Sequence, residues 1–488
     1  MPNLFIAGRW RGASEGRQRE IINPFNQAVI AKVAEANADD ARAAVLAARQ
    51  AFDTGEWPGW TAGQRASLLR RVADLLADNK ADLARWETVD TGKTFVESEI
   101  DVDDVVSVFR YYADLAEQDH TRTVDIGQST IVSRVVHEPV GVCVLITPWN
   151  YPLLQASWKI APALAAGNTM VVKPSEVTPL TTVKLVELIE QAGVPAGVVN
   201  LILGAGPEVG PVLTGAPEVD LVSFTGGLAT GQTIMRAAAD TVKKIALELG
   251  GKNPNIVFAD ASFEAAVDHA LTGVFLHAGQ VCSAGTRLIV HADLHDAFVA
   301  ELVRRAGTIR LGNGLAPDSR SGPLVSAEHR AKVERHVAKA VAEGATLLCG
   351  GRRPDDPQLQ GGFFYLPTIF DACRRDMSIV QEETFGPILT VETFTTEDEA
   401  VELGNDTDYG LAGAVWTEDR TLARRVAGRL RHGTVWINDF GPYLPQAEWG
   451  GFKRSGIGRE LGPAGLAEYQ EAKHIYENTD PRPENWFA

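Results

Sequence analysis

Two residues that could do chemistry lie close to glycines. Cys282 lies in His277-Ala-Gly-Gln-Val-Cys-Ser-Ala-Gly-Thr-Arg287, among small and polar residues where backbone amides can approach a ligand closely. Glu248 ends an apolar run just before two glycines. From these residues alone, Cys282 is either an inert buried thiol or a nucleophile. Glu248 is likewise either a structural ion-pair partner or a general base held at a cleft.

Two glycine-rich turns could bind the phosphates of a dinucleotide. The run Leu203-Gly-Ala-Gly-Pro-Glu-Val-Gly210 has the spacing G-x-G-x-x-x-G, one residue longer than the usual fingerprint, and a tight strand-to-helix turn is the alternative. In Phe224-Thr-Gly-Gly-Leu-Ala-Thr-Gly231 a strand again opens into a helix, whose N-terminus could face a pyrophosphate. Each turn alone is a weak signal.

Alternating strands and helices must position these residues. Residues 40–120 predict amphipathic helices, including one over 39–52 and one over 65–86. Beyond residue 140 the alternation implies a parallel sheet with right-handed crossovers, and such sheets bind ligands where strands end and helices begin. The pattern predicts strands at 140–146, 169–173, 198–203, 221–224 and 244–249, and helices near 153–166, 180–192, 207–214 and 230–239. A second alternating stretch predicts strands at 255–258 and 287–290 and helices near 262–276 and 294–308.

Composition excludes several classes of function. The 488 residues exceed one compact core and predict two or three domains. A net charge of −17 with scattered Lys and Arg argues against a nucleic-acid partner. The N-terminus lacks a signal-peptide pattern, and no apolar run could span a bilayer. The four cysteines have no paired or metal-ligand spacing, so we expect a reduced, cytoplasmic protein without a metal site.

Seven motifs in order carry a resemblance to the aldehyde dehydrogenase superfamily over nearly the whole chain. They are Pro148-Trp-Asn-Tyr-Pro152, Lys173-Pro-Ser-Glu176, Phe224-Thr-Gly-Gly227, Glu248-Leu-Gly-Gly-Lys252, Gly279-Gln-Val-Cys282, Glu382-Glu-Thr-Phe-Gly-Pro387 and Gly450-Gly-Phe-Lys-Arg-Ser-Gly456. The resemblance implies oxidation of an aldehyde to a carboxylic acid, through a thiohemiacetal and a thioester on a cysteine.

The resemblance also implies catalytic roles for four residues. Cys282 is similar to the family's nucleophile and Glu248 to its general base, which activates the thiol, the hydrolytic water or both. Asn150 and the backbone N–H of Cys282 match the donors that stabilise the oxyanion. Glu460 matches a second carboxylate in a proton path.

Cofactor residues carry over in the same way. Lys173 and Glu176 resemble the pair that binds the adenosine ribose, and a carboxylate there favours NAD over the alternative, NADP. Glu383 matches the residue holding the nicotinamide ribose, and Phe385 should pack against the cofactor. Gly227 stands where the family often has serine. The missing hydroxyl should lower the affinity for the cofactor without changing the reaction. The full expected set is Thr147, Trp149, Lys173, Ser175, Glu176, Gly206, Gly210, Phe224, Thr225, Gly226, Gly227, Leu249, Glu383 and Phe385.

Aromatic residues suggest a cationic substrate. Tyr151, Trp158 and Trp449 fall at positions that line the family's aldehyde tunnel, although each alone could be ordinary core. Together they resemble the aromatic box of betaine aldehyde dehydrogenases and their aminoaldehyde relatives, where rings hold an ammonium group. Asp104 aligns with another tunnel position, and a solvated acidic helix face is its alternative.

The family resemblance implies an α/β fold in three parts. We expect a Rossmann-like cofactor domain from 1–117 and 138–249, an α/β catalytic domain from 250–455, and a small β oligomerisation element from 118–137 and 456–488. A homodimer or a homotetramer is expected. The alternatives in function are a general aliphatic or aminoaldehyde dehydrogenase, a thiol-dependent hydrolase and a non-catalytic structural protein.

Overall fold

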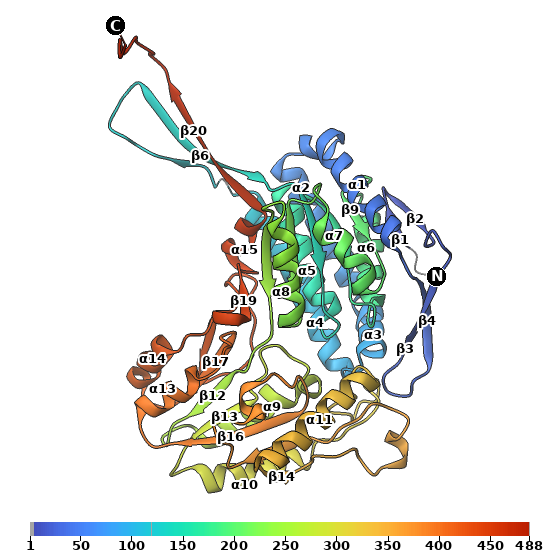
Figure 1. The fold of residues 1–488 in the computed structure, drawn as a ribbon, viewed down its shortest axis with the longest axis vertical. Helices are drawn as coiled ribbons and strands as arrows, with labels where there is room; N and C mark the ends of the chain where they lie inside the picture. Colours follow the sequence, from blue (N-terminus) through green and yellow to red (C-terminus); the bar gives the residue numbers. More distant parts are fainter. Residues whose placement is uncertain (1–3, 119, 488) are drawn as a thin grey trace.

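The computed structural model describes residues 4–118 and 120–487, which form two lobes and a projecting arm (Figure 1). The larger lobe is built on an eight-stranded sheet of order β19-β11-β10-β7-β8-β9-β1-β2. Its strands are β1 (Leu4–Ile6), β2 (Arg9–Arg11), β7 (Val142–Ile146), β8 (Thr169–Lys173), β9 (Val199–Leu201), β10 (Leu221–Thr225), β11 (Lys244–Glu248) and β19 (Gly456–Ile457). The five strands expected between residues 140 and 249 are present and mutually parallel.

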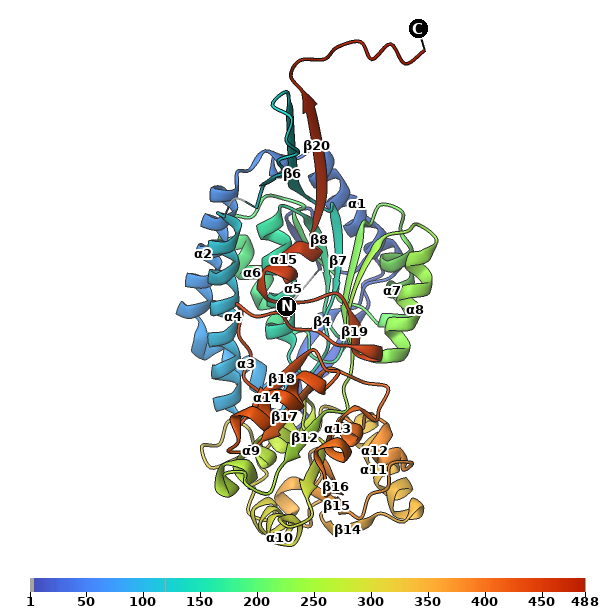
Figure 2. The same cartoon turned by 90° about the vertical axis from the view of Figure 1, so that its left-hand side faces the viewer.

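Helices cover both faces of this sheet, as expected for strands that are mostly apolar and are buried along their whole length. In Figure 2, α2, α4 and α6 lie to one side of the sheet and α1, α7 and α8 to the other. The helices of this lobe are α1 (Ala38–Thr54), α2 (Ala62–Asp78), α3 (Lys80–Thr91), α4 (Phe95–Ala116), α5 (Pro152–Ala166), α6 (Leu180–Gln191), α7 (Gly206–Gly215) and α8 (Leu228–Ala239). None of the helices in the described part of the chain is long and apolar enough to cross a membrane.

The single helix predicted over 65–86 is wrong, because the chain forms two helices that meet at Asn79. The side-chain amide of Asn79 donates to the carbonyl of Leu75 at 2.8 Å. Asparagine competes with the helical backbone for hydrogen bonds in this way, so the periodic apolar pattern continues while the helix stops.

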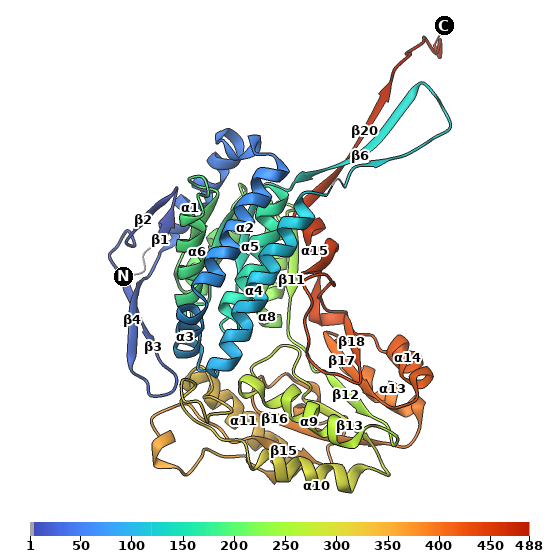
Figure 3. The ribbon, with the colours of Figure 1, turned by 180° about the vertical axis from the view of Figure 1, so that it is seen from behind.

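The smaller lobe holds a seven-stranded sheet of order β14-β15-β16-β13-β12-β17-β18 (Figure 3). Its strands are β12 (Pro254–Val257), β13 (Arg287–His291), β14 (Thr346–Cys349), β15 (Thr368–Asp371), β16 (Ile388–Phe394), β17 (Ala412–Trp416) and β18 (Thr434–Ile437). Its helices are α9 (Phe263–Phe275), α10 (His295–Ala306), α11 (Ala327–Glu343), α12 (Ser378–Gln381), α13 (Glu397–Asn405) and α14 (Arg420–Arg429).

A three-stranded sheet of order β20-β6-β5 forms the arm, which leads away from both lobes toward the C-terminus (Figure 1). Its strands are β5 (Arg122–Thr123), β6 (Ile131–Pro139) and β20 (Gln470–Asn478). The oligomerisation element expected from residue 456 includes residues that belong to the larger lobe. There β19 pairs with β11, and α15 (Gly462–Glu468) packs on α5, so the arm itself begins with β20. Residues 1–3, 119 and 488 of the expected domains lie outside the described residues. A separate hairpin joins β3 (Gln18–Ile22) to β4 (Val29–Ala34).

Candidate active site

A cavity of about 870 Å³ opens at the carboxyl ends of the parallel strands of the larger sheet. The chain runs from β7 to β8 and β9 on one side, then returns to β10 and β11 on the other side of β7. Ligands of open α/β sheets bind at such a switch point. The smaller lobe supplies Cys282 and Glu383 to the same cavity, so the site lies between the lobes.

Cys282 follows an irregular turn before β13 and lines the cavity. Burial, together with the negative charges of Glu383 and Glu248, raises the pKa of Cys282 to about 12. The thiol therefore keeps its proton at neutral pH and needs a base to become a nucleophile. The other three cysteines lie outside this cavity.

The turn before Cys282 is left-handed at three consecutive residues. His277, Ala278 and Gly279 have φ values of 46°, 52° and 74°. For each of the two non-glycine residues this conformation costs on the order of 1–3 kcal/mol, so neighbouring contacts must hold it. The turn directs the carbonyl of Gln280 toward Asn150, whose side-chain nitrogen donates to it at 2.9 Å.

Glu248 is the last residue of β11, and its carboxyl group lies in the same cavity as Cys282. Neither carboxyl oxygen has a hydrogen-bond partner among the described residues, although both are buried. Burial and the negative charge of Glu460 raise the pKa of Glu248 well above its usual range, against the opposing effect of Lys159. A buried carboxyl without partners that lines the same cavity as a thiol has the properties of a general base with raised proton affinity.

Glu460 lies behind Glu248 and does not line the cavity. Its carboxylate forms a buried ion pair with Lys159, and Lys159 also donates to the hydroxyl of Ser223 at 3.1 Å. The backbone of Glu460 exchanges two hydrogen bonds with Trp449, of 2.6 and 2.7 Å. The structure therefore places Glu460 next to the expected base, in a fully buried polar cluster.

All fourteen expected cofactor residues line the cavity. At one end, Lys173 and Glu176 form an ion pair of 3.0 Å, and the backbone N–H of Gly206 donates to Glu176 at 3.4 Å. Burial alone would raise the pKa of Glu176, but Lys173 and these hydrogen bonds hold it below its usual value. Glu176 is consequently charged at neutral pH.

The cavity fits a dinucleotide in two further respects. The hydroxyls of Thr147 and Thr225 are buried and have no partner among the described residues, so they are free to bind a ligand. A Cβ placed on Gly206, Gly210 or Gly227 would meet no atom within 4 Å, so packing within the protein does not require glycine there. Open backbone at a helix N-terminus is what a phosphate group needs for close approach, and Gly227 caps α8.

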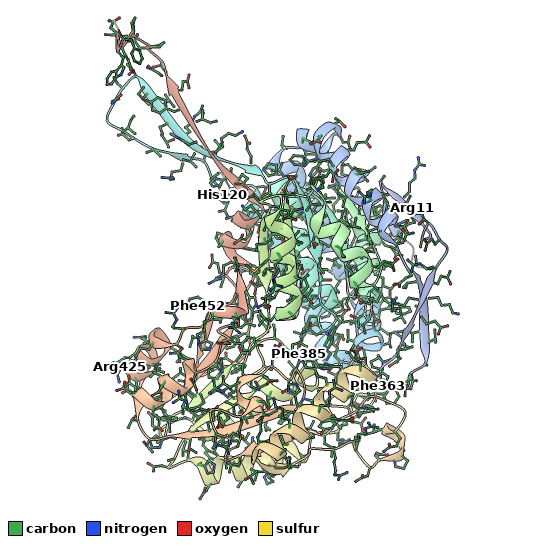
Figure 4. All side chains as sticks on the ribbon, in the orientation of Figure 1. Arg11, His120, Phe363, Phe385, Arg425 and Phe452 are labelled. Carbon is green, nitrogen blue, oxygen red and sulfur yellow. The ribbon has the colours of Figure 1, made fainter. Side chains whose placement is uncertain are left out.

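The opposite end of the cavity is built around Glu383 and Phe385, the latter between the two lobes (Figure 4). The backbone N–H of Gly251 donates to Glu383 at 3.0 Å. Phe385 is left-handed, with φ 63°, and the Nε2 of His329 lies 2.6 Å from its carbonyl oxygen. Burial lowers the pKa of His329 to about 4, so a neutral ring donates this bond. Sequence reasoning missed His329, for which no pattern in the chain gave a signal.

Four aromatic side chains surround the substrate end, and only three of them line the cavity: Tyr151, Trp158 and Tyr443. Sequence reasoning missed Tyr443, whose ring lies 5.6 Å from Trp158 and whose hydroxyl lies 2.6 Å from that of Ser283. Trp449 packs edge-on against Tyr443 at 4.9 Å and lies in a second layer behind the cavity wall.

Asp104 is partly buried on α4, and it does not line the cavity. Burial and the negative charge of Asp103 raise the pKa of Asp104 to about 6. One turn before it, Asp101 forms a buried ion pair with Lys93 at 2.5 Å, and the Lys93 nitrogen lies 4.0 Å from the centre of the Tyr151 ring. Asp101, rather than Asp104, is therefore linked to the aromatic wall, through Lys93.

Comparison with known proteins gives one consistent result. The sequence profile of the Aldehyde dehydrogenase family matches residues 10–475. Betaine aldehyde dehydrogenase from Bacillus subtilis is 60% identical over 484 residues, covering 99% of each chain. Peroxisomal aminoaldehyde dehydrogenase 2 from Pisum sativum is 43% identical over 490 residues, covering 99% of this chain and 97% of the relative.

A solved structure agrees with these sequences. The crystal structure of betaine aldehyde dehydrogenase from Staphylococcus aureus in complex with NAD+ superposes with a TM-score of 0.98 at 55% identity, covering 100% of this chain and 96% of that chain. The expected fold is confirmed. The chain belongs to the aldehyde dehydrogenase family and is an oxidoreductase.

Proposed function

We propose that this enzyme oxidises betaine aldehyde to glycine betaine with NAD as the electron acceptor. The observation that carries the proposal is one cavity that joins the thiol of Cys282, the carboxyl of Glu248 and the amide of Asn150 to an aromatic wall. The similarity to betaine aldehyde dehydrogenases over the full chain supports the substrate, and the NAD+ complex of the Staphylococcus aureus enzyme supports the cofactor.

The first chemical step takes place at the sulfur of Cys282. Glu248 accepts the thiol proton, and the thiolate attacks the aldehyde carbon to form a thiohemiacetal. Because burial raises the pKa of both groups, transfer of the proton between them costs less than transfer to an ordinary carboxylate. The free N–H of the Asn150 amide and the backbone N–H of Cys282 stabilise the negative oxygen.

When bound, NAD would accept the hydride that the thiohemiacetal must lose from its carbon, together with the hydroxyl proton, to become a thioester. Once its first proton has passed to solvent, Glu248 takes a proton from the water that attacks the thioester; the acid is released, and the sulfur of Cys282 leaves as a thiolate that is protonated again. Lys173 and Glu176 would hold the adenosine ribose, the N-terminus of α8 the pyrophosphate, and Glu383 with Phe385 the nicotinamide half. NAD is favoured over NADP because Lys173 is already paired with Glu176, so a 2′-phosphate would meet an anion.

Aminoaldehyde oxidation is the second candidate, and the similarity to aminoaldehyde dehydrogenases favours it. Both substrates carry a cation that aromatic faces attract. A kinetic panel of betaine aldehyde, 4-aminobutyraldehyde and a neutral aliphatic aldehyde, each with NAD and NADP, ranks them. A preference for the neutral aldehyde would replace both candidates with a general aldehyde dehydrogenase.

The test of the mechanism is Cys282→Ala. We expect it to abolish NADH formation while leaving NAD binding measurable by protein fluorescence, because only the covalent step needs the sulfur. Cys349→Ala is the matched control, since Cys349 is a partly buried thiol outside the cavity. Near-normal turnover by Cys282→Ala would end this mechanism.

We also infer that the arm makes contacts between subunits of a homodimer or homotetramer. Support comes from β20, which is exposed along nearly all of its nine residues, and from the exposed side chains of Tyr476, Trp486 and Phe487 near the C-terminus. The cysteines form no disulfide among the described residues, which suits a reduced, cytoplasmic protein. The inference is tested by measuring molar mass by light scattering for the whole chain and for a chain that ends before β20. A truncated chain that folds and keeps the same number of subunits would contradict the inference.

A further inference from the structure

We propose that Gln280 is a positioning residue for the amide of Asn150, and that it acts through the left-handed turn before Cys282. This inference rests on the proposed function, in which Asn150 stabilises the oxyanion. It concerns a side chain that does not line the cavity and touches no reacting atom.

Gln280 is completely buried, and each end of its side-chain amide makes one hydrogen bond to the backbone. Its nitrogen donates to the carbonyl of His277 at 3.0 Å, and its oxygen accepts from the backbone N–H of Val325 at 2.9 Å. The side chain therefore ties the turn to the segment that precedes α11. A buried amide that is satisfied at both ends has one orientation, so its own main chain is fixed as well.

The backbone carbonyl of Gln280 is the group that orients Asn150. It accepts one of the two N–H groups of the Asn150 amide at 2.9 Å. The second N–H is then fixed in direction and available to the substrate oxygen. Since oxyanion donors act by being placed in advance of the reaction, a rotation of this carbonyl would misdirect the donor.

Side-chain contacts support this strained turn, in addition to the backbone bond from the N–H of Gln280 to the carbonyl of His277 at 3.1 Å. His277 and Ala278 have φ values of 46° and 52°, in the region that residues other than glycine rarely adopt. A second contact comes from α4, where the carboxylate of Glu97 accepts from the backbone N–H of His277 at 2.7 Å. The side chain of Gln280 donates to the carbonyl of His277, and that of Glu97 accepts from its N–H. The two side chains therefore fix the backbone on both sides of His277.

The test is a double-mutant cycle of Gln280→Met with Asn150→Ala. Methionine keeps the length of glutamine but can form neither hydrogen bond. The measurement is the rate of the pre-steady-state burst of NADH with betaine aldehyde, which reports the steps up to the thioester. Removing an oxyanion donor costs about 10²–10³ in rate, so Gln280→Met should cost roughly 10- to 100-fold in the wild-type background, as a partial loss of the same effect. In the Asn150→Ala background it should cost less than about 3-fold, because the group it positions is gone.

Alkylation of Cys282 by iodoacetamide separates positioning of the amide from a general disturbance of the loop. Alkylation forms no oxyanion, so its rate should stay the same in Gln280→Met. An equal loss of burst rate in both backgrounds, or a parallel loss of alkylation, would overturn the inference. If Gln280→Met does not fold, the same cycle with Gln280→Glu decides, since glutamate keeps the acceptor for Val325 but loses the donor to the carbonyl of His277. A wild-type enzyme without NADH formation would instead refute the proposed function, before any variant is compared.

Discussion

The order of the aromatic rings leads to the sharpest prediction, because Trp158 lines the cavity and Trp449 lies one layer behind it. Both side chains are buried, with 2% and 4% of their surface exposed, so they offer a matched pair. We compare Trp158→Leu with Trp449→Leu, since leucine keeps an apolar side chain and removes the ring. Each variant is assayed for kcat/KM with betaine aldehyde and with 3,3-dimethylbutanal, which has the same shape and no charge.

The expected magnitude follows from the environment of the ring. A cation–π contact is worth about 0.5–1 kcal/mol at exposed sites and about 2 kcal/mol when desolvated. Because the Trp158 ring is almost fully buried, a contact of about 1–2 kcal/mol applies, which is roughly 5- to 30-fold in rate. Trp158→Leu should lower the preference for the charged substrate by this factor. Trp449→Leu should lower kcat/KM by the same factor for both substrates, because this variant loses packing behind Tyr443 but does not lose a contact with the cation.

Only the ratio between the two substrates reports on charge, since both lose packing when a ring is removed. If Trp449→Leu changed the ratio and Trp158→Leu did not, the assignment of layers would be wrong. If neither variant changed it, cation–π attraction would have no part in selectivity, and a general aldehyde dehydrogenase would become the better description. Melting temperatures of the two variants control for unequal damage to the fold.

Four further predictions follow from the site and its surroundings. Glu248→Gln should lower steady turnover by at least roughly 10²-fold, and a surviving NADH burst would assign Glu248 mainly to hydrolysis of the thioester. Because the pKa of Glu248 is raised, its carboxylate appears only as pH rises, so wild-type kcat/KM should rise with pH; in Glu248→Gln the rise should move to the higher pH at which the Cys282 thiol ionises without a base, and an unchanged profile would refute the assignment. Gly227→Ser should lower the KM for NAD a few-fold, since a side chain there meets open space and adds a hydroxyl, and a raised KM would contradict this. Burial lowers the pKa of His432 to about 3. Below pH 6.5 this histidine is therefore protonated in the unfolded chain but stays neutral in the folded chain. Its contribution to the free energy of unfolding should fall by about 1.4 kcal/mol per pH unit down to about pH 3. Denaturation of His432→Asn across this range should show a shallower dependence on pH.

The strands that form the cofactor end of the cavity could be predicted from the sequence, because each is recognised from the composition of a short segment. Strands β7, β8, β10 and β11 are mostly apolar runs that end near glycine or polar residues, and buried parallel strands typically have this composition. Their carboxyl ends meet along one edge of the sheet, so Lys173, Thr225 and Glu248 had to lie near one another once the sheet was parallel. The family motifs then supplied the roles of these residues.

The substrate end was harder because its wall is assembled from distant segments without regular structure. Tyr443 lies in an irregular loop between β18 and β19, where neither strand nor helix periodicity indicates which way a side chain points. Trp449 lies in the same loop and looked equivalent in sequence, yet its backbone pairs with Glu460 and turns its ring to the second layer. Which ring reaches a cavity depends on such pairings, and composition does not record them.

The strained residues of the site show a more general limit. A glycine marks a left-handed position in a sequence, but His277, Ala278 and Phe385 adopt that conformation without any such mark. All three lie beside Cys282 or the cofactor cavity, where hydrogen bonds with the side chains of Gln280, Glu97 and His329 hold the backbone. Local preference is overruled there by contacts between segments that are far apart in the chain. The side chains that hold such strained residues in place are therefore the ones to test for positioning roles, and Gln280 is the first of them.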